Sequence, residues 1–173
     1  MKNLTQILSL ILLSLGISTY ATGQQYELNP EIQERMKQLS FLEGKWEGSG
    51  WMISQDQNRY TFEQTEEVKF QLSGTHLQIE GKGVSDGEVI HHALAMISPK
   101  TEENKFEFSS YLQSGQKGTF KAEMKEGKFY WFPNEQVRYI ITLNEKGQWF
   151  EIGEYNMGDR WIQFFEMTLD KVE

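Results

Sequence analysis

From Arg59 to Leu72 the chain reads RYTFEQTEEVKFQL, and this stretch decides the fold because its character alternates with a period of two. Every odd position carries a polar or charged side chain, whereas most even positions are apolar. Successive side chains of a β-strand point to opposite faces of the sheet. The pattern therefore predicts a strand with one solvated and one buried face.

The same period continues through the rest of the chain after Gly44. Turn signals rich in Gly, Asn, Asp, Pro and Ser separate the runs, and Asp86-Gly87 and Glu126-Gly127 fit tight hairpins in which glycine adopts a positive φ. No helical segment of useful length interrupts the runs. Parallel strands need such a crossover, so all strands are expected to be antiparallel. The ten predicted strands are 45–53, 59–72, 75–84, 88–98, 105–113, 117–125, 128–132, 136–143, 148–156 and 160–172.

Ten antiparallel strands in an open sheet would leave unpaired edges, so the sheet must curl or close. We therefore predict an all-β fold, a ten-stranded antiparallel up-and-down barrel. A two-sheet sandwich is the alternative. Ahead of the first strand, Asn29-Pro30-Glu31 predicts the start of a short helix, with Asn as the cap and Pro in the first turn. One face of this helix is expected to carry Ile32, Met36 and Leu39.

The first 23 residues are expected to be a targeting signal rather than part of the fold. A basic start precedes a largely apolar stretch at 4–17, and small residues follow it. This order is typical of a secretory signal peptide, with cleavage after Ala21 or Gly23. An uncleaved membrane anchor is the alternative, but the stretch is shorter than the roughly 20 residues that a span needs. We predict a signal peptide (1–23), one domain (24–173), export to a periplasm or the medium, and no membrane span after cleavage.

The composition excludes several classes of protein. The chain has 173 residues, no cysteine, and a formal charge of −8 from 17 basic and 25 acidic side chains. Without cysteine, disulfide-stapled folds, thiol enzymes and iron–sulfur clusters are excluded. Nucleic-acid-binding proteins usually carry an excess of basic side chains, whereas acidic side chains are in excess here, so no nucleic-acid partner is expected. Aromatic residues, at 13%, supply ample apolar surface for a packed core.

Two polar side chains, Gln64 and Glu66, lie on the otherwise apolar face of the 59–72 strand. A ten-stranded barrel is wider than the eight-stranded kind that side chains fill, so it can hold a cavity. Glu66 is then either a ligand-facing carboxylate or a residue beside a bulge or an open mouth, and both interpretations stay open. A buried carboxylate needs a cation or a hydrogen-bond donor, and Arg138 and Arg160 are the candidate partners.

Both ends of the predicted domain resemble known families. Residues 39–50, LSFLEGKWEGSG, resemble the entry of calycin-type barrels, where a helix leads into a strand bearing Gly-x-Trp; nitrobindin-like haem barrels have a similar entry. Residues 161–169, WIQFFEMTL, resemble the last strand of an exported bacterial family, the domain-of-unknown-function 1579 group. The resemblance implies a calycin-like barrel, distantly similar to lipocalins and fatty-acid-binding proteins, with no settled activity. It also implies that Trp46 closes the barrel floor against the helix, often under a stacked Arg.

Motifs for cofactors and hydrolysis are missing from the sequence. Nitrobindin-like barrels use a histidine near the end of the chain, but no histidine follows His92 here, so no haem is expected. Because His91 and His92 are adjacent, at most one points into the barrel. Histidine-rich metal triads and a Gly-x-Ser-x-Gly elbow are also absent. Gly81-Lys82-Gly83 lacks the helix of a dinucleotide-binding loop and is expected to let the strand bend.

The leading functional prediction is noncatalytic binding of a small lipophilic or amphipathic ligand in the barrel. The alternatives are a barrel enzyme, an isomerase or hydrolase with a cavity Glu or His as base, and an envelope protein-interaction module with an exposed aromatic edge. Glu66 and Glu166 are the expected partners of Arg138. No cofactor, metal or catalytic residue is predicted. The predicted cavity or closure residues are Trp46, Gln64, Glu66, His92, Trp131, Arg138 and Glu166.

Overall fold

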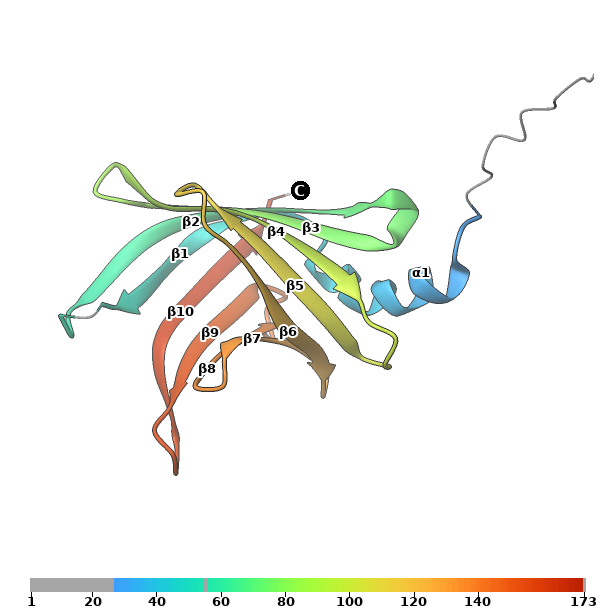
Figure 1. The fold of residues 1–173 in the computed structure, drawn as a ribbon. Coiled ribbons are helices and arrows are strands. Elements are labelled where there is room, and N and C mark those ends of the chain that lie inside the picture. The colour runs from blue at the N-terminus through green and yellow to red at the C-terminus, as the bar shows by residue number, and fades with distance from the viewer. Residues whose placement is uncertain (1–26, 55, 173) are drawn as a thin grey trace, which may run out of the picture.

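Ten antiparallel strands form a closed barrel in the computed structural model, which describes residues 27–54 and 56–172 (Figure 1). Each strand pairs with its sequence neighbours, and β1 (Gly44–Ile53) pairs with β10 (Trp161–Lys171) to close the sheet. The predicted up-and-down barrel is therefore confirmed, and the sandwich alternative is wrong. The remaining strands are β2 (Arg59–Gln71), β3 (His76–Ser85), β4 (Glu88–Pro99), β5 (Lys105–Leu112), β6 (Lys117–Lys125), β7 (Lys128–Asn134), β8 (Val137–Leu143) and β9 (Trp149–Asn156).

The predicted signal peptide at 1–23 lies outside the described residues, so its cleavage stays a prediction. Within 27–54 and 56–172, no helix has the length and apolar character that a bilayer span requires.

A short helical segment covers one end of the barrel, as the sequence predicts. Helix α1 (Pro30–Met36) continues into the 3₁₀ helix η1 (Lys37–Leu42). The Ile32 backbone N–H donates to Asn29 Oδ1 at 3.1 Å, so Asn29 is the N-cap, and Pro30 occupies the first turn. Met36, Leu39 and Leu42 are fully buried against the barrel end. We call this end the floor and the opposite end the mouth.

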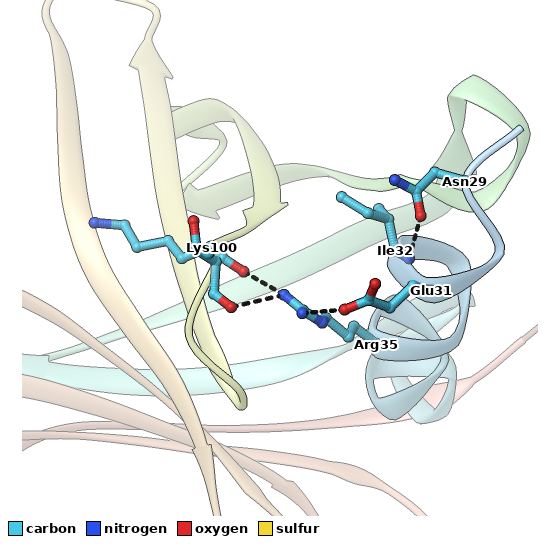
Figure 2. A network of polar contacts seen from close by, with 6 residues as sticks. Asn29, Glu31, Ile32, Arg35 and Lys100 are labelled. Atoms are coloured by element: carbon cyan, nitrogen blue, oxygen red, sulfur yellow. Dashed lines mark hydrogen bonds and ion pairs between the residues drawn. The ribbon is translucent and has the colours of Figure 1, made fainter. Parts of the chain in front are cut away.

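Arg35 fixes the helix to the barrel (Figure 2). Its guanidinium donates to the backbone oxygens of Lys100 at 2.7 Å and Thr101 at 3.0 Å, and it also pairs with Glu31 on the same helix. Lys100 and Thr101 directly follow β4, so the β4–β5 turn lies at the floor. Because the strands are antiparallel, the turns at 86–87, 113–116 and 157–160 all lie at the mouth.

Trp46 seals the floor. Its side chain is 1% exposed, and its Nε1 donates to the Leu42 backbone oxygen at 2.8 Å. Its ring meets Trp149 edge-on, with centroids 5.9 Å apart. The cation over the Trp46 ring is Lys171, with Nζ 5.3 Å from the centroid, where the family resemblance implied an arginine.

The predicted alternation of buried and exposed side chains along β2 is confirmed. Its inward positions from Phe62 to Val68 are buried, and most of the intervening positions are exposed. The two predicted tight hairpins are also present, because Asp86-Gly87 has φ values of 50° and 82° and Glu126-Gly127 has 53° and 73°. Two successive positive φ values suit the right-handed twist of the strands that each turn joins.

Candidate functional site

The barrel interior holds a cavity of about 550 Å³. Every strand from β2 to β9 contributes to its walls. Gln116 and Lys117 line it at the mouth, and Trp149 lines it close to the floor. The cavity therefore extends along the barrel from its open end toward the helix-covered end.

Glu66 lies in this cavity and is 8% exposed. Gln64 Nε2 donates to Glu66 Oε1 at 2.6 Å. Burial raises the pKa of Glu66 to about 8, and the nearby Glu151 adds to the rise. At neutral pH the carboxyl is therefore mostly protonated.

The two glycines beside this carboxyl also make room for side chains, and the register shift between Gly83 and Val84 lies at the predicted bend. A Cβ atom at Gly81 would lie 2.6 Å from both carboxyl oxygens of Glu66, and one at Gly83 would lie 2.8 Å from Gln64 Oε1. Gly81 and Gly83 pair directly with Glu66 and Gln64 across β2 and β3. The missing side chains leave the space that the inward polar pair occupies.

A second buried carboxyl, Glu151 of β9, is 7% exposed and also lines the cavity. Trp149 Nε1 donates to Glu151 Oε2 at 3.2 Å. Burial raises the pKa of Glu151 to about 7. Burial, together with the charge of Glu151, also raises the pKa of the Tyr139 hydroxyl. The inner part of the cavity thus favours neutral forms of all three acids.

Aromatic rings form one wall of the cavity. Trp131 lies parallel between Phe108 and Tyr139, with ring centroids 4.6 Å and 4.4 Å apart. This continuous apolar surface suits the hydrocarbon part of a ligand.

Four of the predicted residues lie inside the barrel. Glu66 and Trp131 line the cavity, Gln64 is buried beside Glu66, and Trp46 lies beneath them at the floor. Contact of these side chains with a ligand stays a prediction.

The histidine that lines the cavity is His91, and the expectation for His92 is wrong. His92 Nε2 lies 3.1 Å from Glu80 Oε1 on the outer surface. A register shift between Gly83 and Val84 places His91 opposite the inward Gly83, and desolvation lowers the pKa of His91. Both faces of residues 88–98 carry apolar residues, so the sequence alone could not decide between the two histidines.

Arg138 does not pair with Glu66 or Glu166, contrary to expectation. Its Nε donates to Glu154 at 2.7 Å, and its guanidinium lies over the Trp161 ring at 4.0 Å. Arg138 alternates with the cavity-lining Tyr139, so it points outward.

Glu166 also lies outside the cavity. It accepts hydrogen bonds from Gln163 Nε2 at 2.7 Å and Trp51 Nε1 at 3.4 Å. The neighbouring Met167 is buried in the core, so Glu166 faces the opposite side of β10. Its polar neighbours, rather than a ligand, satisfy this carboxylate.

Sequence reasoning missed three inward residues: His91, Tyr139 and Glu151. For Tyr139 and Glu151 the usable signal was strand parity, that is, whether a position is an even or odd number of residues from a buried one. Glu151 is two residues from the buried Trp149 and therefore shares its face, and Tyr139 shares the face of the buried Ile141. Glu151 was not singled out as an inward residue because many Glu residues lie on solvated strand faces.

The comparisons with known proteins support the fold. Neither a protein-family model nor a curated protein sequence matches the chain. Among solved structures, the chain is similar to Rv2717c from M. tuberculosis, with a TM-score of 0.62 and 12% sequence identity over 85% of this chain and 100% of that chain. A likeness at this identity concerns the fold and carries no activity with it. Membership of the domain-of-unknown-function 1579 group and likeness to nitrobindin-like barrels stay predictions.

Proposed function

We propose that the barrel binds a small lipophilic or amphipathic molecule without transforming it. The observation that carries this proposal is the cavity of about 550 Å³ with a stacked aromatic wall and a few polar groups at its inner end. Ligand sites typically measure about 300–1,000 Å³ and combine apolar walls with a few placed polar groups.

The surface near the mouth supports entry of an apolar molecule. Large apolar side chains are exposed at the strand ends around the mouth. These positions do not contribute to the core, and polar residues there would make the protein more soluble. These residues are Tyr60, Val89, Ile90, Tyr111, Leu112 and Met157.

The enzyme alternative has weaker support. A carboxyl whose pKa is near 7 can serve as a general acid or base, but an enzyme also needs groups that stabilise the charge developing on its substrate, and the described side chains that donate to Glu66 and Glu151 are all neutral. Neither Glu66 nor Glu151 has an ion-pair partner among the described residues. An interaction module, in turn, would not need an internal cavity.

Fluorescence of N-phenyl-1-naphthylamine tests the binding proposal, because this probe brightens in apolar sites. Ala93→Trp fills the cavity from β4, whereas Leu94→Trp adds the same side chain to the exposed outer face one residue away. We expect the wild type and Leu94→Trp to bind the probe, and Ala93→Trp to lose roughly tenfold or more in affinity. Equal binding by folded Ala93→Trp would overturn the proposal.

We also propose export to a periplasm or the medium, on the strength of the signal-like residues 1–23. N-terminal sequencing of the protein from its host would find a start after Ala21 or Gly23. A start at Met1 in the cytoplasmic fraction would overturn this proposal.

A further inference from the structure

The polar groups at the inner end of the cavity are acids without a cation. Glu66 and Glu151 are both more than nine-tenths buried. The donors that reach them, Gln64, Trp149 and Trp131, are all neutral. In the described part of the chain, no side chain donates to Glu66 Oε2, and Glu66 lines the cavity. This end therefore offers carboxyl oxygens that no cation of the described residues would neutralise when they ionise.

Two basic side chains line the cavity on its mouth side. Lys117 begins β6 at the mouth, and His91 lies near the mouth end of β4. Lys117 therefore lies at the opposite end of the cavity from the two carboxyls. His91 lies opposite Gly83 and beside Gln64, but desolvation lowers its pKa and so favours its neutral form. The cavity thus changes from an acidic inner end, along apolar walls, to a mouth surrounded by exposed apolar residues.

Three classes of ligand head group can be compared at this inner end. An anionic head group would meet two carboxyls and no cation, which is unfavourable in a desolvated site. A Ca²⁺ ion prefers six to eight oxygen ligands, and the described residues contain no group of three or more potential metal ligands. An ammonium group carries one compact positive charge and three donors, which suits two carboxylates.

On the basis of the proposed binding function, we infer that the ligands are amphipathic amines, whose protonated ammonium group lies between Glu66 and Glu151. The hydrocarbon part then extends along the ring wall of Phe108, Trp131 and Tyr139 toward the mouth. The net charge of −8 favours the approach of a cation over that of an anion.

The raised pKa values of the two inner carboxyls support this inference, because they predict that amine binding releases protons that can be measured. Burial raises the pKa of Glu66 to about 8 and that of Glu151 to about 7. A bound ammonium group favours the ionised carboxylates and lowers both values, so amine binding near pH 7 releases protons. The other titratable groups facing the cavity are His91, Lys117 and Tyr139; desolvation lowers the pKa of His91, and burial raises that of Tyr139.

Displacement of N-phenyl-1-naphthylamine by decylamine, decanol and decanoate separates the head groups while the tail stays constant. Near pH 8 we expect decylamine to bind at least tenfold more tightly than decanol, and decanoate to bind most weakly. The double variant Glu66→Gln/Glu151→Gln should lose the preference for the amine and retain decanol binding. Glu166→Gln, which changes an outer carboxyl, is the matched control and should retain the preference.

Titration calorimetry of the wild type provides a test that does not depend on the folding of variants. In two buffers of different ionisation enthalpy near pH 7, decylamine binding should release protons and decanol binding should release none. Equal affinities for amine and alcohol, tighter binding of decanoate, or amine binding without proton release would overturn the inference while leaving the binding function intact. Failure of the probe and of all three decyl compounds to bind would overturn both.

Discussion

Two glutamates of the barrel wall, Glu66 and Glu154, show how strongly the two sides of one sheet differ. Glu66 faces the cavity, receives a hydrogen bond from the neutral Gln64, and has its pKa raised to about 8 by burial. Glu154 faces outward and pairs with Arg138 at 2.7 Å. The same side chain is thus a neutral acid on one face and part of an ion pair on the other.

The difference shows that strand parity decides the chemistry of this protein more than residue type does. Water and a nearby cation stabilise the ionised form outside the barrel, whereas the described residues at the inner end of the cavity offer only neutral donors. The inward acids therefore supply the polarity of the candidate site, and the outward ones hold strands together and maintain solubility.

The largest difference is expected between two tryptophans of β1. Trp46 is 1% exposed at the floor, whereas Trp51 lies on the outer face under Arg59, whose guanidinium is 3.8 Å from its ring centroid. Trp46→Ala should lower the free energy of unfolding by about 3–5 kcal/mol, because it leaves a cavity beside Trp149 and Leu42. Trp51→Ala should cost about 1 kcal/mol or less.

Urea denaturation followed by circular dichroism measures both tryptophan variants. Equal losses of stability would mean that the floor contacts of Trp46 contribute no more than the surface contacts of Trp51. That result would contradict the assignment of the floor as part of the core.

The next effect is the pH dependence of stability. The pKa of Glu66 is about 8 in the folded protein, against 4.5 for a solvated glutamate, so the folded state binds more protons within this interval. The contribution of Glu66 to the free energy of unfolding is therefore fully present below about pH 4.5. It decreases by a few kcal/mol as the pH rises toward 8. Glu66→Gln should reduce this fall to the share that Glu151, with a pKa of about 7, contributes, and should make the protein more stable than the wild type near pH 8.

Glu154→Gln is the outer control for this pH dependence. It should keep the wild-type fall between pH 5 and 8, because the carboxyl that it removes is ion-paired on the outer face and is neither of the two buried in the cavity. Thermal melts at half-unit pH steps provide the comparison. A wild-type stability that rises with pH over this interval would contradict the neutral inner carboxyl.

Most of the fold could be predicted from the sequence because antiparallel strands are encoded locally. Alternation in residues 59–72 and turns such as Asp86-Gly87 identify strands and hairpins without knowledge of distant contacts. Ten antiparallel strands must then curl or close, and the structure shows the closed barrel rather than the sandwich alternative. The N-cap at Asn29 is equally local.

The candidate site was less predictable because it depends on which residues meet across strands. The inward direction of Glu66 follows from parity, but its neighbour Glu151 lies far away in sequence. Arg138 was assigned to the wrong carboxyl because charge alone cannot distinguish the faces of β8. His91 depends on a register shift within a strand that is apolar on both faces. Such a shift has no local sequence signal here.

A smaller effect is expected at Gly81, which makes room for the Glu66 carboxyl. In Gly81→Ala the new Cβ would lie 2.6 Å from both oxygens, so the carboxyl must leave its hydrogen bond with Gln64. We expect a loss of about 1–2 kcal/mol in the free energy of unfolding. Lys82→Ala, one residue away on the exposed face, should change it by less than about 0.5 kcal/mol.

A double-mutant cycle identifies the cause of the Gly81 effect. In the Glu66→Ala background, where the carboxyl is missing, Gly81→Ala should cost much less than in the wild type. An unchanged cost would show that the backbone of β3, rather than the space beside Glu66, requires glycine at this position.

The smallest effect is expected for the outer ion pair itself. The side chains of Arg138 and Glu154 are 26% and 16% exposed, so solvent and salt screen their attraction. A cycle with Arg138→Gln and Glu154→Gln should give a coupling energy of at most about 1 kcal/mol, which decreases as sodium chloride is added. The equivalent cycle with Gln64→Ala and Glu66→Ala should be insensitive to salt, because that contact is buried and involves a mostly neutral acid. If salt weakened both couplings alike, the inner carboxyl would be ionised and solvated, and the contrast between the two faces of the barrel would fail.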